Sequence, residues 1–278
     1  MFTAAVQPAT VSIFSSTGSD PLCLWSQHTD PELTADSFIC FIVDDKSSPT
    51  PPAPATLITP HSLPSSNEVR QQDSPVNEGR TITQTVLHIQ SPTLRTTFIR
   101  CPPIGYISAA SSRSNRVGQL SLRHPWLHMQ VRNLGRAWSF EVGLVDQAGK
   151  EGVVRCSTFQ TSPAVKLRPA ASPLLHLPLA FPDASSTPLT SWTTLSLHLP
   201  SLLPHFSSAS LVRDDDRADE DEDEDMGDRR NGAIPSGAFS HVSYTKVYAT
   251  CRVRRVWFAQ TPVGSGKDIP WEFQLYAE

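Results

Sequence analysis

The sequence predicts an all-β protein in which many short strands form a sandwich or barrel. Apolar residues recur with a period of two in a series of short runs, which is typical of half-buried strands. No comparable run favours a long amphipathic helix. Because a sheet with one apolar face must bury that face against another layer, we expect two packed sheets.

Each predicted strand rests on a run of its own. The clearest lies at residues 138–144, where the even-numbered positions are apolar and Glu141 would face the other way. Similar runs predict strands, in chain order, at residues 11–14, 38–43, 81–90, 126–132, 152–158, 193–199, 242–249, 251–258 and 271–276. Residues 169–188 are rich in proline, but their leucines predict an extended crossover that packs on the body.

We expect a single β-sandwich domain over residues 1–278, with three insertions outside its body. Residues 44–80 are predicted to be a disordered Ser/Pro-rich insertion, residues 104–116 a loop insertion, and residues 213–239 a disordered acidic insertion. These segments lack the apolar side chains that would offset the entropy cost of ordering them. The prolines of the first insertion also cannot donate to a sheet ladder.

The net charge of −4 conceals two regions of opposite sign. Residues 214–228 hold 11 of the 27 acidic residues, whereas the rest of the chain holds 22 basic and 16 acidic residues. The body is therefore basic, which suits an anionic partner. The acidic tract would repel such a partner or fold back over the basic face, and a solvated loop is its simplest interpretation.

The sequence favours an intracellular protein. No run of about 18 apolar residues is present to span a bilayer, and no basic leader precedes an apolar segment, so neither a membrane anchor nor a signal peptide is expected. Five scattered cysteines fit a reduced compartment better than a disulfide framework. Cys101 and Cys251 are expected to be small buried hydrophobic residues.

No motif predicts an enzyme, a cofactor or a metal site. The glycines before Lys267 resemble a phosphate loop, but Thr261 stands where that loop needs its first glycine, so a turn is expected. The nine histidines are dispersed and no Cys-x-x-Cys pair occurs. Glu141 has no evident second carboxylate for glycoside hydrolysis. We therefore expect a non-catalytic protein.

The candidate partner-binding surface centres on residues 251–258. If the side chains alternate, Arg252 and Arg254 face solvent, and a β-bulge at Arg255 would bring three guanidinium groups onto one surface. Arginine binds carboxylates through two parallel donors, so this ridge is predicted to dock an acidic partner. The patch is predicted to extend to Lys246, Lys166, Arg168 and Arg132.

Two alternatives to this docking surface remain open. The arginines could simply solubilise an outer strand and pair with Glu141 or Glu151, which stabilises a surface little. Nucleic acid is a weaker alternative, because the aromatic residues that would stack on bases occupy core positions. Those residues are Trp126, Trp138, Trp257 and Trp271.

Several blocks of the sequence resemble one family in the same order. They include Trp25 near the start, residues 97–102, residues 118–146, the segment 192–199, and the final segments 251–258 and 270–276. This pattern is similar to that of the small cilia- and flagella-associated β-proteins of the axonemal inner junction, also called the basal-body up-regulated family. The resemblance implies a jelly-roll-like antiparallel β-sandwich, similar to carbohydrate-binding modules.

The resemblance also implies a function. The expected role is non-enzymatic and structural, in a protein that binds tubulin and neighbouring junction proteins at the inner junction of axonemal doublet microtubules or at the basal body. The expected location is the cytoplasm and cytoskeleton, in a cilium or flagellum, with the nucleus as a further site. In an organism without cilia, a nuclear or cytoplasmic scaffold is the alternative, with the acidic tract engaging a basic partner.

A binding module for a sugar or another small ligand is the remaining alternative. Such a module stacks its ligand on aromatic side chains exposed on one sheet. The candidates are Trp126, Trp138 and Trp192, and finding them buried would count against this alternative.

Overall fold

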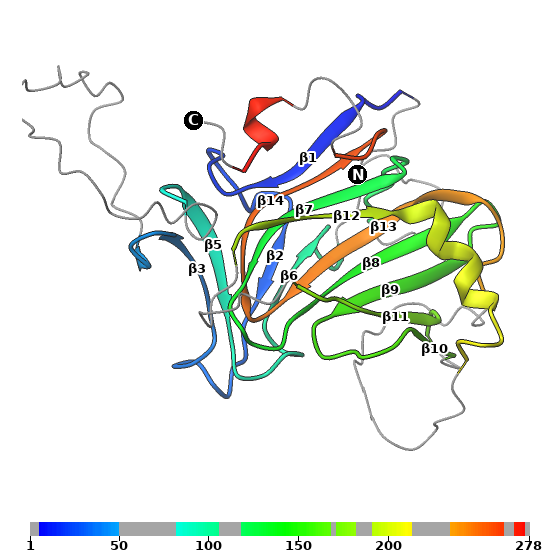
Figure 1. The fold of residues 1–278 in the computed structure, drawn as a ribbon, viewed down its shortest axis with the longest axis horizontal. Coiled ribbons are helices and arrows are strands. Elements are labelled where there is room, and N and C mark those ends of the chain that lie inside the picture. Colours follow the sequence, from blue (N-terminus) through cyan, green and yellow to red (C-terminus); the bar gives the residue numbers. More distant parts are fainter. Residues whose placement is uncertain are drawn as a thin grey trace, which may run out of the picture.

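The described strands form two seven-stranded sheets that face each other (Figure 1). The computed structural model describes residues 6–49, 82–105, 118–167, 171–181, 191–212, 234–263 and 270–275. The sheets are mostly antiparallel and do not close into a barrel. The predicted all-β sandwich is confirmed.

Sheet A runs in the order β12 (Thr193–His198), β7 (Trp126–Asn133), β14 (Cys251–Ala259), β5 (Thr85–Gln90), β3 (Phe38–Val43) and β4 (Ser48–Pro49). β1 (Thr10–Ser15) also pairs with β14. All of these pairs are antiparallel.

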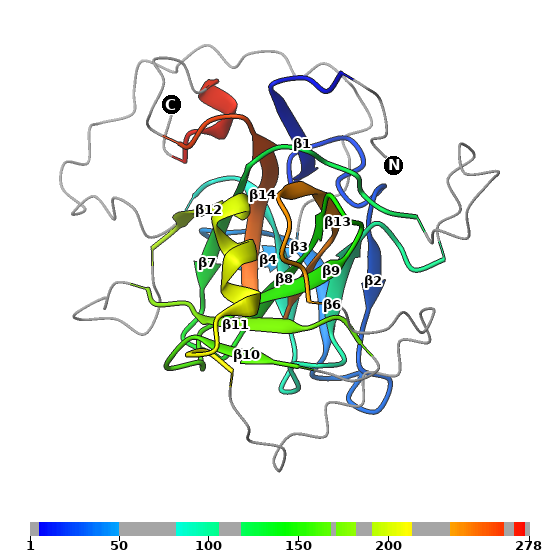
Figure 2. The same ribbon diagram turned by 90° about the vertical axis from the view of Figure 1, so that its right-hand side faces the viewer.

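Sheet B runs in the order β10 (Ala164–Lys166), β11 (Leu174–Pro178), β9 (Glu151–Ser157), β8 (Ser139–Asp146), β13 (Phe239–Tyr248), β6 (Phe98–Cys101) and β2 (Ser26–His28). Its one parallel pair among the described strands is β11 with β9. The 3₁₀ helix η1 (Leu199–Ser207) packs beside β8, β9, β11 and β13 at one end of the sandwich (Figure 2). A second 3₁₀ helix, η2 (Trp271–Phe273), lies near the C-terminal end of the described chain.

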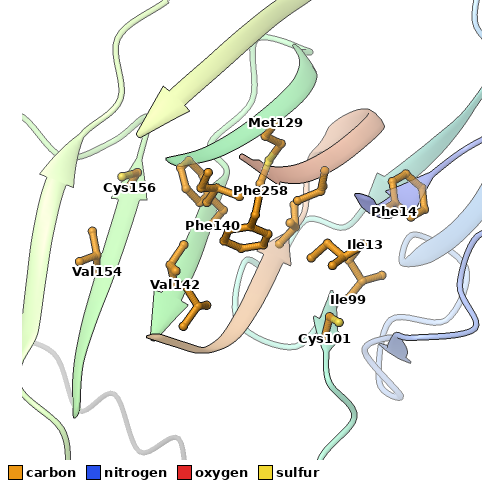
Figure 3. Close-up of a cluster of buried hydrophobic side chains, with 14 of the residues drawn as sticks. Ile13, Phe14, Ile99, Cys101, Met129, Phe140, Val142, Val154, Cys156 and Phe258 are labelled. Carbon is orange, nitrogen blue, oxygen red and sulfur yellow. The ribbon is translucent and has the colours of Figure 1, made fainter. Parts of the chain in front are cut away.

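The main core lies between the sheets and draws apolar side chains from both. Phe258 and Met129 of sheet A lie near Phe140 and Val142 of sheet B in Figure 3. Trp138 is fully buried in this core. Along β14, Cys251, Val253, Val256 and Phe258 face inward, which confirms the predicted inward positions.

A β-bulge divides β14, as the sequence predicted, because its register shifts between Val253 and Arg255. Before the bulge, one edge of β14 pairs with β5, and after it the same edge pairs with β1. Ser16 joins the two neighbours: its N–H donates to the carbonyl of Arg254 (2.8 Å) and its hydroxyl donates to the carbonyl of Thr85 (2.6 Å). The sheet therefore branches at Arg254.

A second apolar cluster covers the outer face of sheet A. It consists of Ile42, Ile82, Val86 and Trp192, with Cys40 and Leu275 packed against it. Val86 faces outward here because its neighbour Leu87 faces the main core. Part of the outer face of sheet A is therefore covered by apolar side chains and is not exposed to solvent.

Most predicted strands are confirmed, and one is wrong. Residues 271–276 were expected to form a strand, but Trp271–Phe273 is a 3₁₀ helix. The segment lies across the outer face of sheet A and bonds to side chains there instead of joining a ladder. The crossover expected at residues 169–188 contains β11, which packs on the body through Leu174 and Leu175.

The predicted insertions at 44–80, 104–116 and 213–239 fall mostly outside the described residues. Their described ends belong to the body: Asp44 is buried, Ser48–Pro49 pairs with β3, and Phe239 begins β13. The single-domain organisation stays a prediction. In the described ranges, no helix combines the length and the apolar character that a membrane crossing requires.

Candidate partner-binding surface

The arginines of β14 lie on the outer face of sheet A, but they do not form an exposed ridge. Arg252 is 8% exposed and Arg254 is 5% exposed, and Arg132 on the neighbouring strand β7 is 3% exposed. The prediction that Arg252 and Arg254 face solvent is therefore wrong. Alternation placed them on the correct face of the sheet, but alternation does not reveal that other segments cover that face.

Asp44, at the end of β3, holds two of these arginines. Its carboxylate accepts from Arg132 Nη1 at 3.0 and 3.1 Å and from Arg252 Nη1 at 2.6 Å. Trp192 Nε1 and the backbone N–H of Ile82 also donate to Oδ2, at 2.8 and 2.9 Å. One buried carboxylate thus holds two guanidinium groups, and the three side chains together keep a net charge of +1.

Arg254 is used to anchor the C-terminal segment. Its Nη1 donates to Gln130 Oε1 (2.6 Å) and to the carbonyl of Gln274 (3.1 Å), while Nε donates to Gln84 Oε1 (2.8 Å). Gln130 in turn donates to the carbonyl of Phe273 (2.6 Å). Burial lowers the pKa of Arg254 to about 10, helped by the charge of Arg255, but the group stays charged near neutral pH.

Arg255 is half-buried beside the same segment. Its guanidinium carbon lies 5.0 Å from the centre of the Phe273 ring, which also packs at 5.0 Å against Trp257. Burial lowers the pKa of Arg255, and the nearby Glu272 opposes that effect. The alternative pairing of the β14 arginines with Glu141 or Glu151 is wrong for Arg252, which pairs with Asp44.

The six predicted contact residues do not gather on one surface. Arg132, Arg252, Arg254 and Arg255 belong to sheet A, whereas Lys246 lies on β13 and Lys166 on β10, both in sheet B. Arg168, the further residue of the predicted patch, lies outside the described ranges. The sequence could not show this division, because strand pairing joins segments that are far apart in the chain.

The outer face of sheet B carries a row of charges across four strands, which we call the charge row: Arg100, Lys246, Glu141 and Arg155. Lys246 on β13 is the direct partner of Arg100 on β6 and of Glu141 on β8. Glu141 is in turn the partner of Arg155 on β9. Three cations and one anion give the row a charge of +2.

Glu141 is the anion of this row and is tightly held. Its Oε1 accepts from Arg155 Nε at 2.7 Å and Nη2 at 2.6 Å, and its Oε2 accepts from the hydroxyl of Tyr244 at 3.2 Å. Burial by itself would raise the pKa of Glu141, but Arg155 and Lys246 outweigh it and lower this pKa below its ordinary value. The carboxylate therefore stays ionised at neutral pH.

Aromatic rings surround the cations of the charge row. Lys246 Nζ lies 3.8 Å from the centre of the Phe98 ring and 4.5 Å from that of Tyr248. The guanidinium carbon of Arg100 lies 4.7 Å from the centre of the Tyr244 ring. Such contacts fix the position of a cation without neutralising its charge.

Two of the three tryptophans considered for a sugar-binding platform are buried. Trp138 is fully buried and Trp192 is 4% exposed, with its indole N–H bonded to Asp44. Trp126 is half-buried and packs against His198 at 4.8 Å. Trp138 lies in the main core, as expected, whereas the buried Trp257 lies on the outer face of sheet A against Phe273, not between the sheets. The burial of Trp138 and Trp192 counts against the sugar-module alternative.

No three His, Cys, Asp or Glu side chains among the described residues gather as a metal-binding group. Cys101 and Cys251 are fully buried, as predicted. Burial raises the pKa of Cys101 to about 12 and that of Cys156 to about 12, and it also raises the pKa of Cys251, so these thiols are poor nucleophiles.

Sequence reasoning missed Asp44, Arg100 and Arg155. Asp44 was assigned to the first insertion, although it directly follows an apolar run, where an acidic residue can face a neighbouring strand. Arg100 lies between the inward-facing Ile99 and Cys101, so alternation alone could have placed it on an outer face. Its pairing with Lys246 follows only from the order of the strands.

In a comparison with known protein families, the model of the CFA20 domain matches residues 67–203. This range includes the strands from β5 to β12, which contribute to both sheets. The match supports the cilia- and flagella-associated family that the sequence resembles.

Proposed function

From the CFA20-domain match we propose that this chain is a non-enzymatic structural protein of cilia or flagella, which binds tubulin and neighbouring junction proteins at the inner junction of axonemal doublets or at the basal body. The match is the observation that carries the proposal. The fold is consistent with a structural role, because the two sheets are joined by one continuous core and the outer face of sheet A is sealed by a second cluster. Such a body can transmit force between two partners without a hinge.

The basic surfaces support binding to an acidic polymer. Outside residues 214–228, basic residues outnumber acidic ones by 22 to 16. Electrostatic attraction of this kind raises association rates and weakens as the salt concentration rises. We therefore expect attachment to microtubules that is sensitive to ionic strength.

Co-sedimentation with polymerised tubulin tests the proposal. The intact chain should pellet with microtubules in a saturable manner and should stay in the supernatant when spun alone. A fluorescently tagged copy expressed in ciliated cells should concentrate in the axoneme or at the basal body. Absence of pelleting together with a uniform distribution in such cells would contradict the proposal.

The choice of variants in this test matters. Charge reversal at Arg252 and Arg254 would place carboxylates in buried positions beside Asp44 and Gln130, so a loss of binding would report unfolding. Variants at half-buried cations of sheet B avoid this problem.

A further inference from the structure

The outer face of sheet B places two cations, Arg100 and Lys246, side by side, which the fold alone does not require. Arg100 and Lys246 are direct cross-strand partners in the antiparallel pair β6 and β13. Side chains at such positions lie about 4.5–5.5 Å apart at Cβ, and like charges there are destabilising. Both side chains are only partly buried. An anion placed over the pair would relieve this repulsion.

The surrounding residues hold the two cations in place. Lys246 lies against Phe98 and Tyr248, and Arg100 lies against Tyr244. Tyr244 reaches this position because β13 shifts register between Val242 and Thr245, opposite Gly143 on β8. A Cβ at Gly143 would lie 2.7 Å from two ring carbons of Tyr244, so the close approach requires glycine. The position of the cations is thus specified by several elements.

The carboxylate within the row does not balance these charges. Glu141 accepts two donors from Arg155 and one from Tyr244, in addition to facing Lys246 across the strands. The row keeps a charge of +2 when all four residues are counted. An acidic ligand complements this face, whereas a neutral one does not.

We propose that the charge row on sheet B is a docking surface for an extended acidic peptide of a partner protein, with carboxylates bound by Arg100 and Lys246. In an extended peptide, side chains two residues apart project from the same face about 7 Å apart. Two long side chains rooted on neighbouring strands can meet carboxylates at this spacing.

Acidic peptide fits this face better than a sugar or a nucleic acid does. Those ligands stack on the faces of aromatic rings. Here the rings of Phe98 and Tyr244 are each approached by a cation of the protein itself. The inference rests on the proposed function and deepens it by naming the chemistry of the partner and the surface that meets it.

Fluorescence anisotropy with a labelled hexaglutamate peptide tests the proposal on the full chain. The double variant Arg100→Gln with Lys246→Gln should bind at least about tenfold more weakly than the parent, a difference of about 1.4 kcal/mol. A matched control, Lys46→Gln with Arg123→Gln, removes the same charge from exposed positions elsewhere and should bind within about twofold of the parent. If the double variant does not fold, Arg100→Gln alone replaces it.

Three outcomes would overturn the proposal. The first is equal binding of hexaglutamate by the parent and the double variant, or no binding by the parent. The second is equal affinity of the parent for hexaglutamine. The third is displacement of the peptide by oligothymidylate at lower concentration than by unlabelled hexaglutamate, which would indicate a nucleic-acid surface.

Microtubule pelleting of the same variants separates this inference from the proposed function. If the double variant loses peptide binding but still pellets, the charge row is a peptide site and the microtubule contact lies elsewhere. If the parent binds hexaglutamate but does not pellet, the proposed function fails while the docking surface stands.

Discussion

At the scale of the residue, Asp44 joins polar side chains from several segments at the outer face of sheet A. Its buried carboxylate pairs with guanidinium groups from two strands, β7 and β14, and also accepts from Trp192. A buried cation that loses its anion still carries the full free-energy cost of its desolvation. Removing one partner of a buried ion pair therefore lowers the stability of the protein by more than the intact pair contributes to it.

Asp44→Asn should therefore lower the free energy of unfolding by about 3–5 kcal/mol, because Arg132 and Arg252 would remain buried without an anion. Urea unfolding followed by tryptophan fluorescence measures this change. The neighbouring Asp45→Asn removes the same charge at an exposed position and should change the free energy of unfolding by less than about 0.5 kcal/mol. Equal effects of the two substitutions would show that the Asp44 cluster is not a stabilising contact.

At the scale of the element, the C-terminal segment 270–275 serves as a cover for sheet A. It was predicted to be a strand because Trp271, Phe273 and Leu275 alternate with polar residues. In the structure the segment contributes carbonyl groups to Gln130 and Arg254 and the Phe273 ring to Arg255 and Trp257. The alternation therefore reflects contact with one face, which a short 3₁₀ turn can also make.

Phe273→Ala should release this segment and lower the free energy of unfolding by about 1–2 kcal/mol, since only part of the ring is buried. Hydrogen exchange should show faster exchange of the amide of Phe273, which donates to the carbonyl of Pro270 at 2.8 Å. Gln274→Ala, which changes an exposed side chain and keeps the backbone carbonyl, is the control. Unchanged exchange in the Phe273 variant would mean that the ring does not hold the segment.

At the scale of the whole molecule, the groups that titrate below neutral pH make stability depend on pH in one direction. Burial lowers the pKa of His88 and of His128. The pKa of Glu141 is lowered by Arg155 and Lys246 in spite of burial, and that of Asp146 by backbone N–H donors, also in spite of burial. In each case the unfolded chain binds protons more readily than the folded one, so stability falls as the pH falls.

The free energy of unfolding should therefore decrease in two stages on acidification. The first begins as the pH falls through about 6.5, where unfolded histidine takes up a proton, and the second begins near pH 4.5, where unfolded carboxylates do so. Urea unfolding at a series of pH values measures both stages. Glu141→Gln should reduce the second stage and leave the first unchanged, whereas a flat profile between pH 7 and pH 3 would contradict the assignment.

The alternation of apolar and polar residues was enough to predict the strands' inward positions and the bulge in β14. The alternation in 138–144 and 251–258 placed Phe140, Val142, Val253 and Phe258 in the core, and the extra arginine at 255 predicted the bulge in β14. Both inferences are local, because side-chain direction depends only on the backbone of the same strand.

Only the tertiary structure decided which outer faces are covered and which charges meet. By alternation alone, Arg252 and Arg254 would form a ridge exposed to solvent. Asp44, Trp192 and the C-terminal segment, which are distant in the sequence, cover them instead. Arg100 meets Lys246 because β6 pairs with β13, more than a hundred residues later. Burial and charge pairing depend on contacts between segments distant in sequence, and a pattern within one strand carries no information about them.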